Sequence, residues 1–217
     1  MSAASEDRRT AERAGEARAA PFEQFGPADV RDLIAEYPLA SLGVRAGSEA
    51  PASLLPLLGD YDAAGRLVEL VGHMARRNPL RAALEADPGA WIQVQGPQGY
   101  ISPEQAGRRD WAPTWNYAQL WIEAQVTFTP EETGAAVRRL VETMEAARAA
   151  PWSVEELGRR YTVMEGQIIG FRARVTRVHG RFKLAQDEAP EIARAIIAAT
   201  RDPGLGRWMT RFNADRL

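Results

Sequence analysis

The sequence contains no cysteine and only two histidines among its 217 residues. Without cysteine the chain forms no disulfide and no thiolate metal site, and two isolated histidines do not make a histidine-rich metal site. No apolar run approaches the roughly 20 residues that a membrane-spanning helix needs, and the N-terminus lacks the apolar core of a signal peptide. We therefore expect no metal cofactor and no membrane span, and we predict a soluble cytoplasmic protein.

Positive charge is not in excess. The chain has 27 Lys+Arg against 29 Asp+Glu, which gives a net charge of −2 and a pI near 5.8. We recognise no helix-turn-helix, zinc finger or basic stripe that would bind a phosphate backbone. The composition therefore does not support direct DNA binding.

Lysine is almost absent, because Lys183 is the only lysine among the 27 basic residues. Lysine offers a compact charge with three rotatable donors where arginine offers a planar fork, so the two are not interchangeable in a tight polar site. Lys183 is therefore a candidate functional residue. The alternatives are chance, or a lysine whose apolar stem packs on a neighbour.

The chain is otherwise typical of a globular protein, with 45% hydrophobic residues. Its length suits one domain with a sizeable core. Residues 1–20 are mostly alanine, arginine and glutamate, with no large apolar residue after Met1. We predict a disordered tail over residues 1–20 and a single domain over residues 21–217.

Apolar and polar residues alternate over 117–128 and 167–178, and more briefly over 90–95, as half-buried strands require. Residues 39–44 and 52–58 flank turn residues and predict a hairpin, and 67–74 predict a further strand. Buried parallel strands would be continuously apolar, so the pattern favours an α+β fold, mainly antiparallel β, with a barrel and flanking helices. We expect His179 and Gly180 in a turn. Trp121 on a polar strand face predicts a homodimer interface.

Helix signals occur between these strands. Gly26-Pro27 starts a helix that Pro38 ends, Thr129 starts another, and Ser102 and Ser153 each open a capping box. Two helices close the chain. The second carries an apolar stripe that must pack on the barrel or on a partner subunit, formed by Leu205, Trp208, Met209 and Phe212.

Asn78-Pro79 marks the junction between a strand and a helix. Asparagine is a preferred N-cap and proline a preferred first helical residue. The first-turn N–H groups and helix dipole then lie beside Arg76, Arg77 and Arg81, which is a suitable environment for a phosphate. A capped junction with solvated arginines is the equally good alternative.

Four blocks of sequence resemble the PaiB family, the FMN-binding negative transcriptional regulators. They are residues 72–79 (GHMARRNP), 96–103 (GPQGYISP), 112–117 (APTWNY) and 180–186 (GRFKLAQ). The resemblance spans roughly residues 22–212 and implies a split β-barrel of the FMN-binding type. It also implies a homodimer with FMN at the subunit interface.

The resemblance further implies a set of cofactor-binding residues. The phosphate and ribityl chain would be held by His73, Arg76, Asn78 and Lys183. The ring pocket would be lined by Thr114, Trp115 and Asn116. Ala75 and Gln186 complete the set. Trp115 could equally be a buried core residue. Asn116 could equally be a residue that hydrogen-bonds the backbone at a bend. Two departures from the family lie nearby: Leu54 replaces a histidine, and Glu104-Gln105 replace Trp-Tyr.

Three functions remain open from the sequence. The first is a flavin-binding regulatory or sensor protein, and the second is a flavin-dependent reductase or oxidase of the same fold. The third is a cofactor-free dimer that keeps only the scaffold, which the departures at Leu54 and Glu104 allow. No nucleophile–base pair or carboxylate dyad has a recognisable spacing, so we expect no catalytic residue and lean away from an enzyme.

Overall fold

Six strands close into a barrel in the order β1-β2-β3-β6-β5-β4, and every neighbouring pair is antiparallel. The computed structural model describes residues 21–45 and 52–217, so the predicted tail and most of the predicted hairpin turn lie outside the described residues. The strands are β1 (Leu39–Val44), β2 (Ser53–Tyr61), β3 (Leu67–Ala75), β4 (Gly89–Ile101), β5 (Thr114–Phe128) and β6 (Ile168–Lys183). The predicted fold class is confirmed.

Helices flank the barrel. The α-helices are α2 (Pro27–Glu36), α3 (Pro79–Ala86), α4 (Thr133–Glu145), α5 (Arg159–Glu165), α6 (Pro190–Ala199) and α7 (Pro203–Phe212). Short 3-10 turns are η1 (Pro21–Glu23), η2 (Pro130–Glu132) and η3 (Val154–Leu157). The capping box predicted at Ser102 is present and opens a short turn: the N–H of Ser102 donates to Gln105 at 2.9 Å, and the N–H of Gln105 donates to the Ser102 hydroxyl at 3.3 Å. The predicted helix at Ser153 is η3 and α5, divided by Gly158 at φ +53.

The alternating pattern of β5 places its apolar residues inside the barrel, as the sequence predicts. Leu120, Ile122, Ala124 and Val126 are all buried. Since successive strand residues point to opposite faces, the intervening polar residues lie on the outer surface. The core is therefore built from one face of each strand.

β6 is longer than the sequence predicts. His179 and Gly180 do not form a turn; they continue the ladder opposite Trp121 and Leu120. A Cβ on Gly180 would lie 2.7 Å from the ring of Phe25, so this glycine permits close packing. The strand consequently extends to Lys183.

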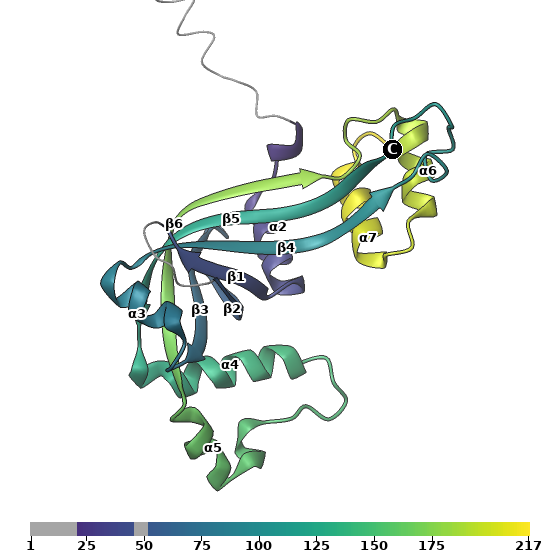
Figure 1. Cartoon of the computed structure of the whole chain (residues 1–217). Helices are drawn as coiled ribbons and strands as arrows, with labels where there is room; N and C mark the ends of the chain where they lie inside the picture. Colours follow the sequence, from purple (N-terminus) through teal and green to yellow (C-terminus); the bar gives the residue numbers. More distant parts are fainter. Residues whose placement is uncertain (1–20, 46–51) are drawn as a thin grey trace, which may run out of the picture.

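β4, β5 and β6 continue past the barrel as a ribbon that reaches α6 and α7 (Figure 1). β1 pairs with β4 only as far as Val94, whereas β4 pairs with β5 as far as Ile101. α7 covers one face of this ribbon, and its Trp208 and Phe212 stack on Phe182 at centroid distances of 5.8 and 4.9 Å. The apolar stripe of α7 is thus buried within the chain and gives no support for a partner subunit.

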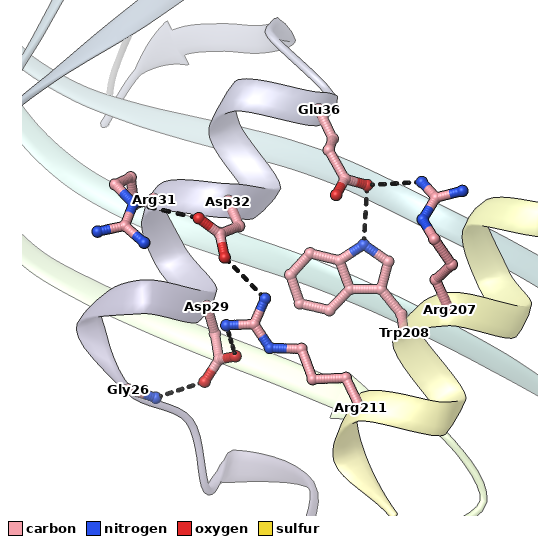
Figure 2. Close-up of polar contacts among 8 residues, drawn as sticks. All are labelled: Gly26, Asp29, Arg31, Asp32, Glu36, Arg207, Trp208 and Arg211. Carbon is pink, nitrogen blue, oxygen red and sulfur yellow. Dashed lines mark hydrogen bonds and ion pairs between the residues drawn. The ribbon is translucent and has the colours of Figure 1, made fainter. Parts of the chain in front are cut away.

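Polar contacts fix α7 against α2 (Figure 2). Arg211 bridges Asp29 and Asp32 at 2.8 Å each. The indole N–H of Trp208 donates to Glu36 at 3.0 Å. These contacts hold the C-terminal helix, and with it the ribbon, in a defined place on the barrel.

Candidate functional site

Asn78 caps α3 as predicted. Its Oδ1 accepts from the N–H of Leu80 at 3.0 Å, and its carbonyl accepts from the N–H of Arg81 at 3.0 Å. Its amide also donates to Ser53 on β2 at 3.0 Å. The first N–H groups after Pro79 are therefore already bonded, so anion recognition at this junction depends on side-chain charge.

The arginines at the junction have different partners. Arg76 donates from Nε to the carbonyl of Gly166 at 3.1 Å, and Arg81 pairs with Glu85 at 2.8 Å. Arg77 is exposed and forms no ion pair with the residues that the structure describes. Ala75 ends β3 at the same edge. Arg76 and Arg77 are thus the charges that the junction presents to solvent.

His73 lies on the outer face of β3, opposite Gly170 on β6. The start of α4 approaches β6 closely at this point, because a Cβ on Gly170 would lie 3.1 Å from Cα of Thr133, the first residue of α4. α4 packs on both strands here. Burial lowers the pKa of His73 below its usual value, so the imidazole is neutral near pH 7.

Lys183 and Thr114 meet at the far end of the ribbon. The Nζ of Lys183 donates to Oγ1 of Thr114. Lys183 also pairs with Tyr117 across the ladder, and Trp115 lies two residues from Tyr117 on the same face. We call Tyr100, Thr114, Trp115, Tyr117, Arg181 and Lys183 the ribbon-end cluster.

Aromatic rings and a second cation complete the ribbon-end cluster. Trp115 and Tyr100 are each 51% exposed and meet edge to face at 6.0 Å. Arg181 donates to the hydroxyl of Tyr117 at 3.1 Å. The cluster therefore combines exposed aromatic surface with two positive charges.

Two predicted residues are occupied within the chain. Asn116 is buried and its amide donates to the sulfur of Met209 at 3.2 Å. Gln186 accepts from the N–H of Leu184 and donates to the carbonyl of Phe182, both at 2.6 Å. Both side chains hold the ribbon in shape and neither is directed at the exposed cluster.

The predicted residues form two groups at opposite ends of β6. Ala75 at the end of β3 pairs with Ile168 at the start of β6, because the two strands are antiparallel. Fifteen steps separate Ile168 from Lys183, or roughly 50 Å along the strand. One chain therefore does not bring Lys183 to Asn78, and Lys183 groups instead with Thr114 and Trp115.

Sequence reasoning missed Tyr117 and Arg181 as neighbours of Lys183, and Tyr100 as the ring that contacts Trp115. The signal was available, because the alternation of β6 continues through Arg181 and Lys183. Because the pairing with β5 shifts register between Val175 and Arg177, β6 also places a row of basic side chains on its outer face, which corrects the expectation that no basic stripe exists. The row is Arg172, Arg174, Arg177, His179, Arg181 and Lys183.

A groove of about 600 Å³ lies beside the ribbon-end cluster. Tyr100 belongs to both, and the opposite wall comes from the connection between α6 and α7, including Arg201. Glu104 and Gln105, the residues that depart from the family, also line it. Glu104 and Gln105 therefore border a groove that also contacts the exposed ring of Tyr100.

Neither a metal site nor a membrane helix is found in the described part of the chain. The described residues hold no group of three or more His, Asp or Glu side chains able to bind a metal ion. None of the described helices has the length and apolar character that crossing a bilayer requires.

Comparison with known structures identifies the fold. A FAD and heme binding protein from Mycobacterium smegmatis superimposes with a TM-score of 0.54 at 12% identity, covering 82% of this chain and 80% of that one. The flavocytochrome Anf3 from Azotobacter vinelandii gives 0.52 at 12% identity, covering 76% and 71%. The fold is therefore a split β-barrel of the flavin-binding type.

Comparison of sequences identifies the family. An uncharacterized protein of Aspergillus fumigatus is 26% identical over 157 residues; the match covers 54% of this chain and only 60% of that protein. A family model described as "Putative FMN-binding domain" matches residues 18–177. This match covers more than half of the chain and supports FMN as the cofactor. The chain therefore belongs to the family of FMN-binding split-barrel domains.

Proposed function

We propose that this chain is a PaiB-like FMN-binding protein with a regulatory or sensor role, and that it functions as a homodimer. The observation that carries the proposal is the contact of Lys183 with Thr114 beside the exposed ring of Trp115. A compact cation, a hydroxyl and an open aromatic face are the groups that a phosphorylated planar ring system requires.

The ribbon-end residues fit FMN. Lys183 would supply positive charge for the phosphate, with Arg181, which also pairs with Glu23 at 3.5 Å, beside it. Trp115 and Tyr100 would offer apolar surface to the ring. When bound, the flavin would supply reversible electron or hydride transfer, and the protein would bind and orient it. Trp115 would exclude water from one side of the isoalloxazine ring, and Lys183 would bind the phosphate at the other end of FMN.

A dimer accounts for the two separated groups. Arg76 and Asn78 lie roughly 50 Å along β6 from Lys183, which is much longer than one flavin. A two-fold axis would place the junction of one protomer beside the ribbon end of its partner, and would do so twice. Leu54, which is 65% exposed beside Ser53 and hence near Asn78, would then give an apolar contact where the family has a histidine.

A flavin-dependent reductase or oxidase is the second candidate. The groove of about 600 Å³ that shares Tyr100 with the cluster is what favours it. Such a groove leaves room for a second molecule beside the ring, as a redox enzyme would need. A sensor that only changes with the redox state of its flavin has no need of this space.

An absorbance spectrum of protein purified without added flavin tests the proposal. We expect the bands of an oxidised flavin, and release by heat should yield FMN. A colourless protein that also fails to bind added FMN would leave the cofactor-free scaffold as the correct function. Steady NAD(P)H oxidation by the loaded protein would favour the enzyme, whereas reduction without turnover would favour the sensor.

A further inference from the structure

Ala185 follows the ribbon end in a backbone conformation that an L residue rarely adopts. Its φ is +71, and among the described residues it is the only non-glycine with a positive value. The residue is buried, so no solvent exposure relaxes it. Such conformations persist only where the surrounding structure enforces them, and they occur often at functional sites.

The C-terminal residues Asn213 and Arg216 enforce this conformation. The amide of Asn213, which is buried, donates to the carbonyl of Leu184 at 2.8 Å. Arg216 donates to the carbonyl of Ala185 at 3.1 Å and also to the carbonyl of Glu188. A bond of 2.7 Å from Arg216 to the side-chain oxygen of Asn213 joins the two residues.

Lys183, the strained residue and the residue after it thus lie in one short segment. Lys183 ends β6, Ala185 holds the strained turn, and Gln186 folds back on the carbonyl of Phe182 at 2.6 Å. Inside the ribbon, Phe182 is fixed by its stacking on α7. Lys183 is the last residue of β6, so the position of its side chain depends both on its pairing with Tyr117 and on the turn that follows it.

We propose that Asn213 and Arg216 are positioning residues for Lys183, and that together they form a C-terminal latch. The latch holds Ala185 at positive φ, which keeps the end of β6 in register and the Nζ of Lys183 beside Thr114. This inference rests on the proposed function, because it assigns to the latch the affinity for the phosphate of FMN. In this role Asn213 and Arg216 would act through the turn at Ala185 and would not touch the ligand themselves.

Arg216→Met tests the latch, because methionine keeps an unbranched apolar stem and removes every donor. We expect roughly a tenfold loss of FMN affinity, with little change for riboflavin, which lacks the phosphate. Arg194→Met is the matched control: Arg194 also contacts the C-terminus, donating to the carbonyl of Leu217 at 2.7 Å, but it has no bond to the turn at Ala185. Its ratio of FMN to riboflavin affinity should match the unmodified protein.

A rescue variant separates positioning from stability. Glycine adopts positive φ without the steric penalty of a Cβ, so Ala185→Gly should restore part of the FMN preference in the Arg216→Met background. Thermal unfolding of each variant is measured alongside. Loss of stability with an unchanged FMN-to-riboflavin ratio in Arg216→Met would overturn the inference, as would an equal fall in Arg194→Met.

Lys183→Ala distinguishes this inference from the proposed function. If Lys183→Ala lowers the FMN-to-riboflavin ratio and Arg216→Met does not, the latch is wrong and the phosphate contact stands. If Lys183→Ala leaves the ratio unchanged, the proposed contact itself is wrong and the latch fails with it.

Discussion

The Nζ of Lys183 on β6 donates a hydrogen bond to Oγ1 of Thr114 on β5. The ring of Phe22 lies 5.9 Å from the same Nζ, which leaves limited space around the ammonium group. The only lysine of the chain therefore occupies a position where its compact shape matters, and a planar guanidinium would not fit there unchanged.

We expect Lys183→Ala to weaken FMN binding by about 1.5–3 kcal/mol, or roughly ten- to hundredfold, through loss of a charge-assisted contact. Riboflavin affinity should scarcely change, and Lys183→Arg should rescue poorly. Fluorescence titration with both ligands measures this. Arg177→Ala, which removes an exposed charge from the same face of β6, is the control. Equal losses for both ligands would place Lys183 near the ring, and no loss for either would make it a solvated residue.

Local sequence signals predicted much of the fold. The alternation of β5 and the cap at Asn78 depend on neighbours in sequence, and both predictions are confirmed. The turn predicted at Gly180 was wrong because a glycine is also required where another chain segment approaches closely. That approach comes from Phe25, more than 150 residues away, and no local pattern reveals it.

The arrangement of the candidate site was harder to predict for the same reason. Lys183 meets Thr114 because β5 and β6 pair in a particular register, and a one-residue shift would turn Lys183 to the other face. Within one chain Lys183 lies far from Asn78, because β3 pairs with the start of β6 and Lys183 stands at its other end. Ala185 carries no sequence signal at all, because alanine is a common residue that rarely adopts positive φ.

We expect light scattering at micromolar concentration to give the mass of a dimer. If each flavin site combines both groups across a two-fold axis, mixing Lys183→Ala with Arg76→Ala chains should restore FMN binding in about a quarter of the sites, because hybrid dimers contain one intact site. Neither variant alone should bind normally. A monomer mass, or a mixture that binds no better than its components, would contradict the dimer.

Sequence-specific DNA binding should be absent or weak. The basic row on β6 is partly neutralised, since Arg172 pairs with Glu69 at 2.5 Å and Arg181 with Glu23 at 3.5 Å. Electrostatic retention without base contacts depends steeply on salt. A gel-shift titration against the protein's own upstream region should therefore show at most salt-sensitive, sequence-independent retention. A tight complex that survives competitor DNA would reveal a reading surface that we have not identified.

Removing the bridge between α7 and α2 should lower stability modestly. Arg211 contacts both Asp29 and Asp32 near the surface (Figure 2), and networks of this kind contribute about 1 kcal/mol. Burial alone would raise the pKa of Asp32. Hydrogen bonds from Arg211 and Arg31 together lower it by more, so the pKa of Asp32 lies below its usual value. The stabilisation that ionised Asp32 gives the folded state is fully present above the usual pKa of an aspartate, and it is lost as the pH falls through the lowered pKa. Urea unfolding of Arg211→Met at pH 7 and pH 3 should show a larger deficit at pH 7 than at pH 3.

His73 should make the fold sensitive to mild acid. Burial beneath α4 lowers its pKa in the folded state, whereas in the unfolded chain the pKa is near its ordinary value of about 6.5. Above pH 6.5 both states hold a neutral imidazole and the difference has no effect. Below it the unfolded state takes up the proton first, so the free energy of unfolding should fall as the pH drops from 6.5 through the folded pKa. His73→Gln should remove this slope between pH 7.5 and 5 in urea titrations, while the exposed His179→Gln should keep it. An identical slope in both variants would mean that the imidazole of His73 reaches water in the folded protein.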